Sequence, residues 1–179
     1  MKFHDTEVRG AMVVEPERHE DERGFFARTW DADEFVQRGL VGQLVQCSVS
    51  YNRRRGTLRG LHYQVFPHQE AKLVRCTGGA MYDVCVDLRP DSETFLAWVG
   101  VDLSADNRLA LYVPEGCAHG FVTREDDTEV AYQMSELHRH EAARGVRFDD
   151  PAFGIAWPES IVVINERDAS YSDFDVESG

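Results

Sequence analysis

Lysine is the scarcest charged residue in this sequence. Only two of the 19 basic residues are lysine, Lys2 and Lys72, and the others are arginine. Acidic residues number 32, which gives a formal net charge of −13. The electrostatic field of this net negative charge repels phosphate groups, so nucleic acid and anionic membrane surfaces are not expected as partners. The chain uses arginine for almost every basic residue, yet it has Lys72 in an apolar, strand-like run. This choice favours a specific functional role for the Lys72 ammonium.

Cysteine is also scarce, and its spacing does not fit a metal site or a disulfide framework. The four cysteines, Cys47, Cys76, Cys85 and Cys117, lie far apart and form no Cys-x-x-Cys pair. Three of them lie in apolar or strand-like runs, where a free thiol behaves as a small apolar side chain. We therefore expect neither disulfides nor a zinc site, and we expect the reducing cytoplasm as the location.

Long apolar runs are missing too. No run approaches the roughly 18 residues that a membrane-spanning helix requires. The N-terminus lacks the basic segment and following apolar segment of a signal peptide, so none is expected. Apolar residues still make up 42% of the 179 residues, which is enough for a hydrophobic core. The length predicts a single domain over residues 1–179, without internal repeats.

Short runs rich in β-branched and aromatic residues recur about every ten residues, bounded by glycine, proline, aspartate or asparagine. This spacing predicts an antiparallel sandwich or barrel rather than β-α-β units. The expected strands are 11–14, 44–50, 58–64, 72–76, 80–88, 94–103, 109–113, 120–123 and 128–134. One short helix is expected over 33–38, with Asp31 or Asp33 as its N-cap and Gly39 after its end. Residues 170–179 are expected to form a loose tail.

The segment Pro114–Phe121 matches the second half of the cupin signature, Pro-x-Gly-x-x-His. In metal-binding cupins this histidine, here His119, joins a His-x-His pair and a glutamate around a divalent ion. The corresponding pair here begins with His62 and ends with Gln64, so one histidine is replaced. Two imidazoles and an amide make a poor transition-metal site. The sequence thus predicts a cupin barrel without a metal, in which His62 is free for another task.

Six segments, in this order, resemble the dTDP-4-dehydrorhamnose 3,5-epimerase family. They are Asp21–Phe26, Gly56–Gln64, Lys72–Cys76, Asp83–Arg89, Pro114–Phe121 and Asp150–Pro158. The resemblance implies an all-β, cupin-type antiparallel jelly roll with short peripheral helices and no cofactor. It also implies a homodimer to which the N-terminal residues 1–30 contribute. The implied reaction inverts carbons 3 and 5 of a nucleotide-diphosphate 4-keto-6-deoxyhexose, by default the dTDP sugar used in rhamnose and lipopolysaccharide synthesis.

Inversion next to a ketone needs a base, a stabiliser of the enolate oxygen and a proton donor on the opposite face. His62 is the candidate base, because imidazole exchanges protons readily near neutral pH. The resemblance makes Asp168 the residue that orients His62 and makes Tyr132 the proton donor. Lys72 matches the lysine beside the developing oxyanion, and a compact ammonium suits a single oxygen.

Other residues are candidates for substrate binding. Arginine binds diphosphate through a bidentate fork, which makes Arg23 and Arg59 candidates. Arg59 faces the site only if the strand bends, and Gly60 permits a bend. Phe26 is a candidate stacking surface. The resemblance adds His119 as a hydrogen-bonding residue beside the sugar. Gln46, Asn52 and His138 lie at positions where the resemblance implies contacts with the nucleotide or the sugar.

Four features depart from the family pattern. Many members have glutamate in place of Arg28, Gln-x-Asn in place of the run Gln46–Asn52, glutamine in place of Glu70, and tyrosine in place of His138. These departures leave open which nucleotide and sugar bind and whether one or two carbons are inverted. The alternatives are a mono-epimerase or 3,4-ketoisomerase acting on a CDP- or GDP-sugar, a metal-dependent cupin oxygenase, and a non-catalytic sugar-binding cupin.

Overall fold

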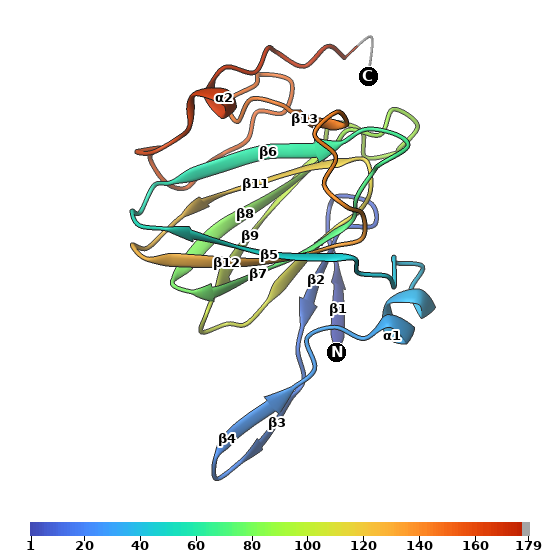
Figure 1. The fold of residues 1–179 in the computed structure, drawn as a ribbon, viewed down its shortest axis with the longest axis vertical. Coiled ribbons are helices and arrows are strands. Elements are labelled where there is room, and N and C mark those ends of the chain that lie inside the picture. The colour runs from blue at the N-terminus through green and yellow to red at the C-terminus, as the bar shows by residue number, and fades with distance from the viewer. Residues whose placement is uncertain (177–179) are drawn as a thin grey trace.

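The computed structural model describes residues 1–176, which fold into two facing antiparallel sheets and a separate two-stranded hairpin (Figure 1). The strand order is β1-β2-β10-β7-β12-β5 in the first sheet and β13-β6-β11-β8-β9 in the second. The first sheet contains β1 (Lys2–Asp5), β2 (Met12–Glu15), β10 (Ala110–Val113), β7 (Lys72–Gly78), β12 (Thr128–Met134) and β5 (Gln46–Asn52). The second contains β13 (Ala143–Gly145), β6 (Leu58–Gln64), β11 (Cys117–Thr123), β8 (Ala80–Asp87) and β9 (Trp98–Ser104). The predicted all-β jelly roll is confirmed.

The main core fills the space between the sheets. Alternate strand residues point to opposite faces, so each strand supplies the core with every second side chain. Val74, Met81 and Phe121 are fully buried there, and they come from β7, β8 and β11. This apolar filling holds the sheets apart and leaves the site residues at its margin.

The outer face of the first sheet is covered by the helix α1 (Ala32–Gln37). Its N-cap is Asp31, whose carboxylate accepts hydrogen bonds from the N–H groups of Asp33 and Glu34. Phe35 is buried edge-on against the ring of Tyr112, with centroids 5.8 Å apart. The predicted helix is thus confirmed, with Asp31 as its cap. Within the described chain, neither helix is long and apolar enough to cross a membrane.

The outer face of the second sheet is covered by the C-terminal segment. Val84 and Val86 of β8 are buried beneath Phe153 and its neighbours. Phe174 packs on Phe153 with ring centroids 5.5 Å apart, and its N–H donates to Asp150. The expected loose tail is therefore anchored at Phe174, while residues 177–179 lie outside the described chain.

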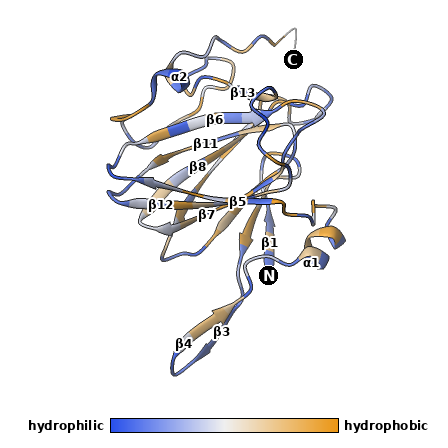
Figure 2. Ribbon diagram, viewed as in Figure 1, coloured by the Kyte–Doolittle hydropathy of each residue, from blue (hydrophilic) through white to orange (hydrophobic). Residues whose placement is uncertain are grey.

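A hairpin of β3 (Arg18–Asp21) and β4 (Gly24–Ala27) projects away from the two sheets (Figure 1). Within residues 1–176, each of these strands pairs only with the other. Figure 2 shows apolar colour along β4, where Phe25 is 41% and Phe26 68% exposed. The sequence did not predict the hairpin, because a four-residue strand of Arg, His, Glu and Asp carries no apolar alternation.

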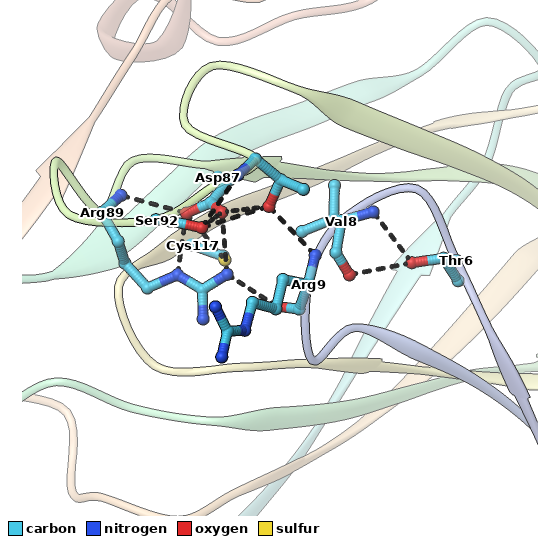
Figure 3. Close-up of polar contacts among 8 residues, drawn as sticks. Thr6, Val8, Arg9, Asp87, Arg89, Ser92 and Cys117 are labelled. Carbon is cyan, nitrogen blue, oxygen red and sulfur yellow. Dashed lines mark hydrogen bonds and ion pairs between the residues drawn. The ribbon is translucent and has the colours of Figure 1, made fainter.

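Most predicted strands match, and the chief difference lies before β9. The run 94–103 was expected to be one strand, but β9 begins at Trp98. Leu96 has a φ of 67°, so the chain turns there instead of extending. The turn is held by Asp87, whose buried carboxylate accepts a hydrogen bond from Ser92 at 2.6 Å (Figure 3). It also accepts one from Thr94 at 2.6 Å.

Asp87 also binds the N-terminal loop through Arg89. The Arg89 guanidinium donates to both carboxylate oxygens of Asp87 at 2.8 Å and to the Arg9 carbonyl at 2.6 Å (Figure 3). Burial alone raises the pKa of Asp87, but the hydrogen bonds from Arg89, Ser92 and Thr94 lower it to about 2. This network takes no part in lining the cavities around His62, Lys72 and Tyr132, and it holds the β8–β9 turn in place.

Candidate active site

Two adjoining cavities, of about 490 Å³ and about 310 Å³, lie between the sheets. Both are lined by His62, Lys72 and Tyr132. His62 lies on β6 of the second sheet, whereas the other two lie on β7 and β12 of the facing sheet. A molecule in this space is therefore approached from opposite sides by His62 and Tyr132. A larger hollow of about 580 Å³ lies beside Arg89, but none of these three residues lines it.

His62 and Asp168 form a hydrogen-bonded pair. His62 Nε2 lies 2.8 Å from Asp168 Oδ1, and the Gly60 N–H donates to Asp168 Oδ2 at 3.1 Å. Asp168 is held by the short helix α2 (Glu166–Ala169), whose N-cap Asn165 accepts from the Asp168 N–H. Burial raises the pKa of Asp168, but the bonds from His62 and Gly60 and the charge of His62 lower it below its ordinary value. An ionised Asp168 accepts a hydrogen bond from Nε2–H of a neutral His62 ring. Nδ1 of that ring then carries no hydrogen and is free to accept a proton.

Gly60 brings Arg59 and His62 to the same cavity. Its φ of 126° is a conformation that residues with a Cβ rarely adopt, and a Cβ there would lie 2.5 Å from Gly120 Cα. The pairing of β6 with β11 also shifts register between His119 and Phe121. As a result Arg59 and His62 line one cavity, and the bend anticipated at Gly60 is present.

Tyr132 is held as a neutral phenol. Its hydroxyl lies 2.9 Å from the Ser50 hydroxyl on the neighbouring strand β5. Burial raises the pKa of Tyr132 to about 12, although the Ser50 bond opposes the shift. A phenol with that pKa keeps its proton at neutral pH and can deliver it when a carbanion forms nearby.

Lys72 is nearly buried and is paired. Its ammonium lies 3.0 Å from Glu70 Oε1 and donates to the His62 carbonyl at 3.1 Å. The side chains of Lys72 and Glu70 are only 9% and 10% exposed. Burying an ammonium is costly unless it is paired and hydrogen-bonded, and here both conditions are met. In the sequence, Glu70 stood out only as a departure from the family pattern, because the pairing depends on how the side chain of Glu70, just before β7, is directed towards Lys72 at the start of β7.

Gln64 stands where a metal-binding cupin would have histidine. Its amide donates to the carbonyls of His68 and Leu137, at 2.9 and 3.3 Å, and accepts from the Arg139 N–H at 2.6 Å. Gln64 therefore fastens two loops beside the cavity. Within residues 1–176, no group of three or more His, Cys, Asp or Glu side chains is arranged to hold a metal ion.

A second histidine–carboxylate pair lies beside the first. His119 on β11 is the direct cross-strand partner of His62 on β6. Its Nε2 lies 2.7 Å from Oδ1 of Asp83, which is fully buried. The His119 ring meets the Tyr132 ring edge-on, with centroids 6.3 Å apart. His119 lines the smaller cavity together with His62 and Tyr132.

Three of the other predicted residues lie in or behind the cavity walls. Gln46 and His138 line the cavity of about 490 Å³, and the His138 N–H donates to Gln46 Oε1 at 3.0 Å. Asn52 is buried and accepts a hydrogen bond from Arg59 Nε at 2.7 Å, so it orients Arg59 from behind.

Arg23 and Phe26 are not brought to these cavities by their own chain. Both lie on the β3–β4 hairpin, and neither lines either cavity. The Arg23 side chain is 84% exposed and pairs with Asp21 on the same hairpin. Their contact with substrate stays a prediction that requires a second copy of the chain.

The structure adds basic residues that the sequence analysis did not single out. Arg144 of β13 and Arg167 of α2 line the cavity of about 490 Å³ together with His138 and Lys72. Arg167 directly precedes Asp168, so the short helix that supplies the carboxylate also supplies a cation. Its position next to Asp168 was the one available signal. Arg144 carried none, because the three-residue strand β13 is too short to predict.

Known proteins resemble this chain over almost its whole length. The family model described as dTDP-4-dehydrorhamnose 3,5-epimerase matches residues 5–175. A dTDP-4-dehydrorhamnose 3,5-epimerase of Methanothermobacter thermautotrophicus is 42% identical over 173 residues, which is 95% of this chain and 92% of the relative. The crystal structure of the Bacillus anthracis dTDP-4-dehydrorhamnose 3,5-epimerase, with TDP and PPi bound, superposes with a TM-score of 0.92 at 38% identity. It covers 97% of this chain and 99% of its own.

A relative with a narrower activity is also similar. ChmJ, a 3′-monoepimerase from Streptomyces bikiniensis crystallised with dTDP-quinovose, superposes with a TM-score of 0.87 at 33% identity. The match covers 95% of this chain and 86% of ChmJ. Similarity of fold thus extends to proteins that invert one carbon as well as to proteins that invert two.

Proposed function

Because the chain belongs to the dTDP-4-dehydrorhamnose 3,5-epimerase family, we propose how its residues carry out the family reaction. The protein is an isomerase that epimerises a nucleotide-linked 4-keto-6-deoxyhexose. The proposed substrate is dTDP-4-dehydro-6-deoxyglucose, and the proposed product is dTDP-4-dehydrorhamnose. The observation that carries the assignment of roles is the His62–Asp168 pair at 2.8 Å, facing Tyr132 across the cavity.

The first step is proton abstraction. His62 Nδ1 removes the proton from a carbon next to the ketone, and the electron pair of the C–H bond moves to the ketone oxygen. His62 becomes an imidazolium, which ionised Asp168 stabilises through Nε2. The ammonium of Lys72 lies in the same cavity and stabilises the enolate oxygen.

The second step is protonation from the opposite face. The Tyr132 hydroxyl gives its proton to the carbanion carbon, and the ketone re-forms as the enolate collapses. Ser50, 2.9 Å from this hydroxyl, supports the phenolate that remains. Solvent then exchanges the protons of His62 and Tyr132, so the pair is reset for the next carbon.

The diphosphate is assigned to the arginines of the cavity. Arg59 is oriented by Asn52, and Arg167 lies at the wall of the adjoining cavity. Guanidinium groups bind phosphate oxygens through bidentate hydrogen bonds. These cations supply local positive charge in a chain whose net charge of −13 is otherwise unsuited to a nucleotide.

A homodimer completes the site in this proposal. The β3–β4 hairpin projects from its own barrel and exposes Phe26 and Arg23 (Figure 1). An exposed aromatic side chain and an exposed guanidinium suit a nucleotide base and a phosphate at the mouth of a partner's cavity. The four free cysteines suit a reducing compartment, and we assign the protein to the cytoplasm.

One experiment tests both the proposed reaction and the number of carbons that are inverted. Proton NMR of dTDP-4-dehydro-6-deoxyglucose with enzyme in D₂O should give solvent deuterium at carbons 3 and 5. Deuterium at carbon 3 alone would identify a mono-epimerase, as in ChmJ. A ketone moved to carbon 3 would identify a 3,4-ketoisomerase. Absence of deuterium with dTDP-, CDP- and GDP-sugars would reject the proposal.

A further inference from the structure

The second histidine–carboxylate pair, His119 with Asp83, differs from the first in how its carboxyl is satisfied. Asp168 accepts hydrogen bonds at both oxygens, from His62 and from the Gly60 N–H. Asp83 is 0% exposed, and its Oδ2 has no hydrogen-bond partner among the described residues. Among the described residues, the one hydrogen bond that its carboxyl makes is to His119 Nε2 at 2.7 Å.

An ionised carboxylate is poorly supported in that position. A buried charge is tolerated only when it is paired and its lone pairs are hydrogen-bonded. An unpartnered oxygen costs less on a neutral carboxyl than on a carboxylate. Burial raises the pKa of Asp83, and the charges of His119 and Lys72 only partly oppose the rise. The surroundings thus favour the protonated carboxyl, the opposite of the preference at Asp168.

The protonation of the carboxyl decides what the imidazole offers to the cavity. A protonated Asp83 donates from Oδ1 to Nε2 of His119, so Nε2 is the bare nitrogen of a neutral ring. The ring proton then lies on Nδ1, the nitrogen left for the cavity that His119 lines. In the neighbouring pair the ionised Asp168 takes Nε2–H of His62, which leaves Nδ1 of that ring bare.

We propose that Asp83 is a protonated positioning residue that makes His119 a hydrogen-bond donor, beside a His62 that is a base. Carboxyl groups in unlike surroundings divide acid and base roles in this way. The Nδ1–H of His119 would bind a sugar oxygen, and Lys72 and Tyr132 are further donors that line this cavity. The role in turnover rests on the proposed epimerase function, whereas the protonation state does not.

The first test locates the ring proton of His119 and the carboxyl proton of Asp83 in the absence of substrate. Long-range ¹H–¹⁵N NMR of histidine-labelled protein at neutral pH reports which ring nitrogen carries hydrogen, with His119→Gln used to assign the signal. We expect a proton on Nδ1 and none on Nε2 of His119. An infrared carbonyl band of a protonated carboxyl should also vanish in Asp83→Asn. A His119 with a bare Nδ1, or a carboxylate at Asp83, would overturn the proposal even if the enzyme is an active epimerase.

The second test uses rescue by a neutral substitute. The amide of Asp83→Asn can donate to Nε2 as a protonated carboxyl does, so this variant should keep kcat within about threefold of the wild type. Asp83→Ala has no donor, and its kcat should fall at least about tenfold with a small change in KM, because His119 Nδ1–H is then no longer fixed as a positioned donor. Asp150→Ala removes another buried carboxyl, which holds the tail, and is the control for destabilisation.

Two kinetic outcomes would reject the role of Asp83 in turnover. One is Asp83→Asn as slow as Asp83→Ala while both unfold at the wild-type temperature, because an ionised carboxylate would then be required. The other is Asp83→Ala that loses no more activity than Asp150→Ala. A wild-type enzyme without deuterium exchange would instead refute the epimerase proposal and leave the NMR result standing.

Discussion

Asp168 acts on the reaction only through His62, so its substitution tests the tautomer of the base. Asp168→Asn retains the shape of the carboxyl, but its amide can donate to Nε2 and leave the proton on Nδ1. We expect kcat to fall by about 10²- to 10⁴-fold, the usual range for loss of a general base. Deuterium incorporation from D₂O, followed by proton NMR, measures this loss.

The control for that substitution lies five residues along the chain. Asp173 is 64% exposed and pairs with Arg147 at the surface. Asp173→Asn should therefore exchange deuterium at the wild-type rate. His62→Ala sets the floor, and an Asp168→Asn variant as fast as Asp173→Asn would contradict the assigned dyad.

Tyr132 has a separable role, because it acts after the proton has been removed. In Tyr132→Phe the base can still abstract a proton and return a deuteron to the same face. We therefore expect deuterium in recovered starting material, with formation of the inverted product slowed by about 10²- to 10⁴-fold. Loss of exchange and inversion in equal measure would show that the phenol is not the opposite-face donor.

At the residue scale, motif position predicted His62, Lys72 and Tyr132, and the structure brings all three to one cavity. The sequence also placed Gly60 where the strand bends. It gave no role to Asp83 or Glu70. Their partners are fixed by strand register and by side-chain direction across a sheet, and neither is encoded in the spacing of residues along one strand.

At the scale of elements, the turn between β8 and β9 depends on Asp87. Its folded-state pKa of about 2 lies below the ordinary value of about 3.9. A depressed pKa stabilises the fold above the unfolded-state value, and that stability is lost as pH falls from about 4 towards about 2. A difference of about two units corresponds to about 2–3 kcal/mol.

The measurement for this element is urea unfolding at several pH values. Asp87→Asn should lower the free energy of unfolding at pH 7 by about 2–3 kcal/mol. The difference from the wild type should shrink as the pH falls below about 4, because the wild-type carboxylate is then being protonated. A difference that stays constant down to pH 2 would mean that the Asp87 charge does not stabilise the turn.

Elements with strong apolar alternation were predictable, and short polar ones were not. The bounds of β6 and β12 agree with the predicted 58–64 and 128–134. β3 and β13 carry no apolar alternation, and their strands form because a neighbour supplies hydrogen bonds. The turn at Leu96 was missed because its partner Asp87 lies across a loop.

At the scale of the whole molecule, the proposed dimer makes the barrel and the hairpin complementary halves of one site. The cavity contains the proposed base, donor and ammonium, yet Arg23 and Phe26 lie on a hairpin that leads away from it (Figure 1). In a two-fold dimer each hairpin can serve the partner's cavity, because the same contact is made twice. Site residues would then come from both chains.

Mixing two defective chains tests this arrangement. Arg23→Ala and His62→Ala homodimers should each be strongly impaired. After joint unfolding and refolding at equal concentration, half of the dimers should be mixed, and one of the two sites in each should be intact. That site combines His62 from one chain with Arg23 from the other. Deuterium exchange should therefore recover to about a quarter of the wild-type rate, as two-fold symmetry with random pairing requires.

The matched control mixes two chains that are defective in the same cavity. His62→Ala and Tyr132→Phe each damage the cavity of the chain that carries them, so every dimer in this mixture has two damaged cavities. No inverted product should therefore be recovered. Recovery in the first mixture alone requires that Arg23 act across the interface. If the first mixture stays as inactive as its components while size-exclusion chromatography shows dimers, Arg23 does not act on the partner's cavity. The hairpin would then serve assembly alone, and the diphosphate would depend on cavity cations such as Arg59 and Arg167.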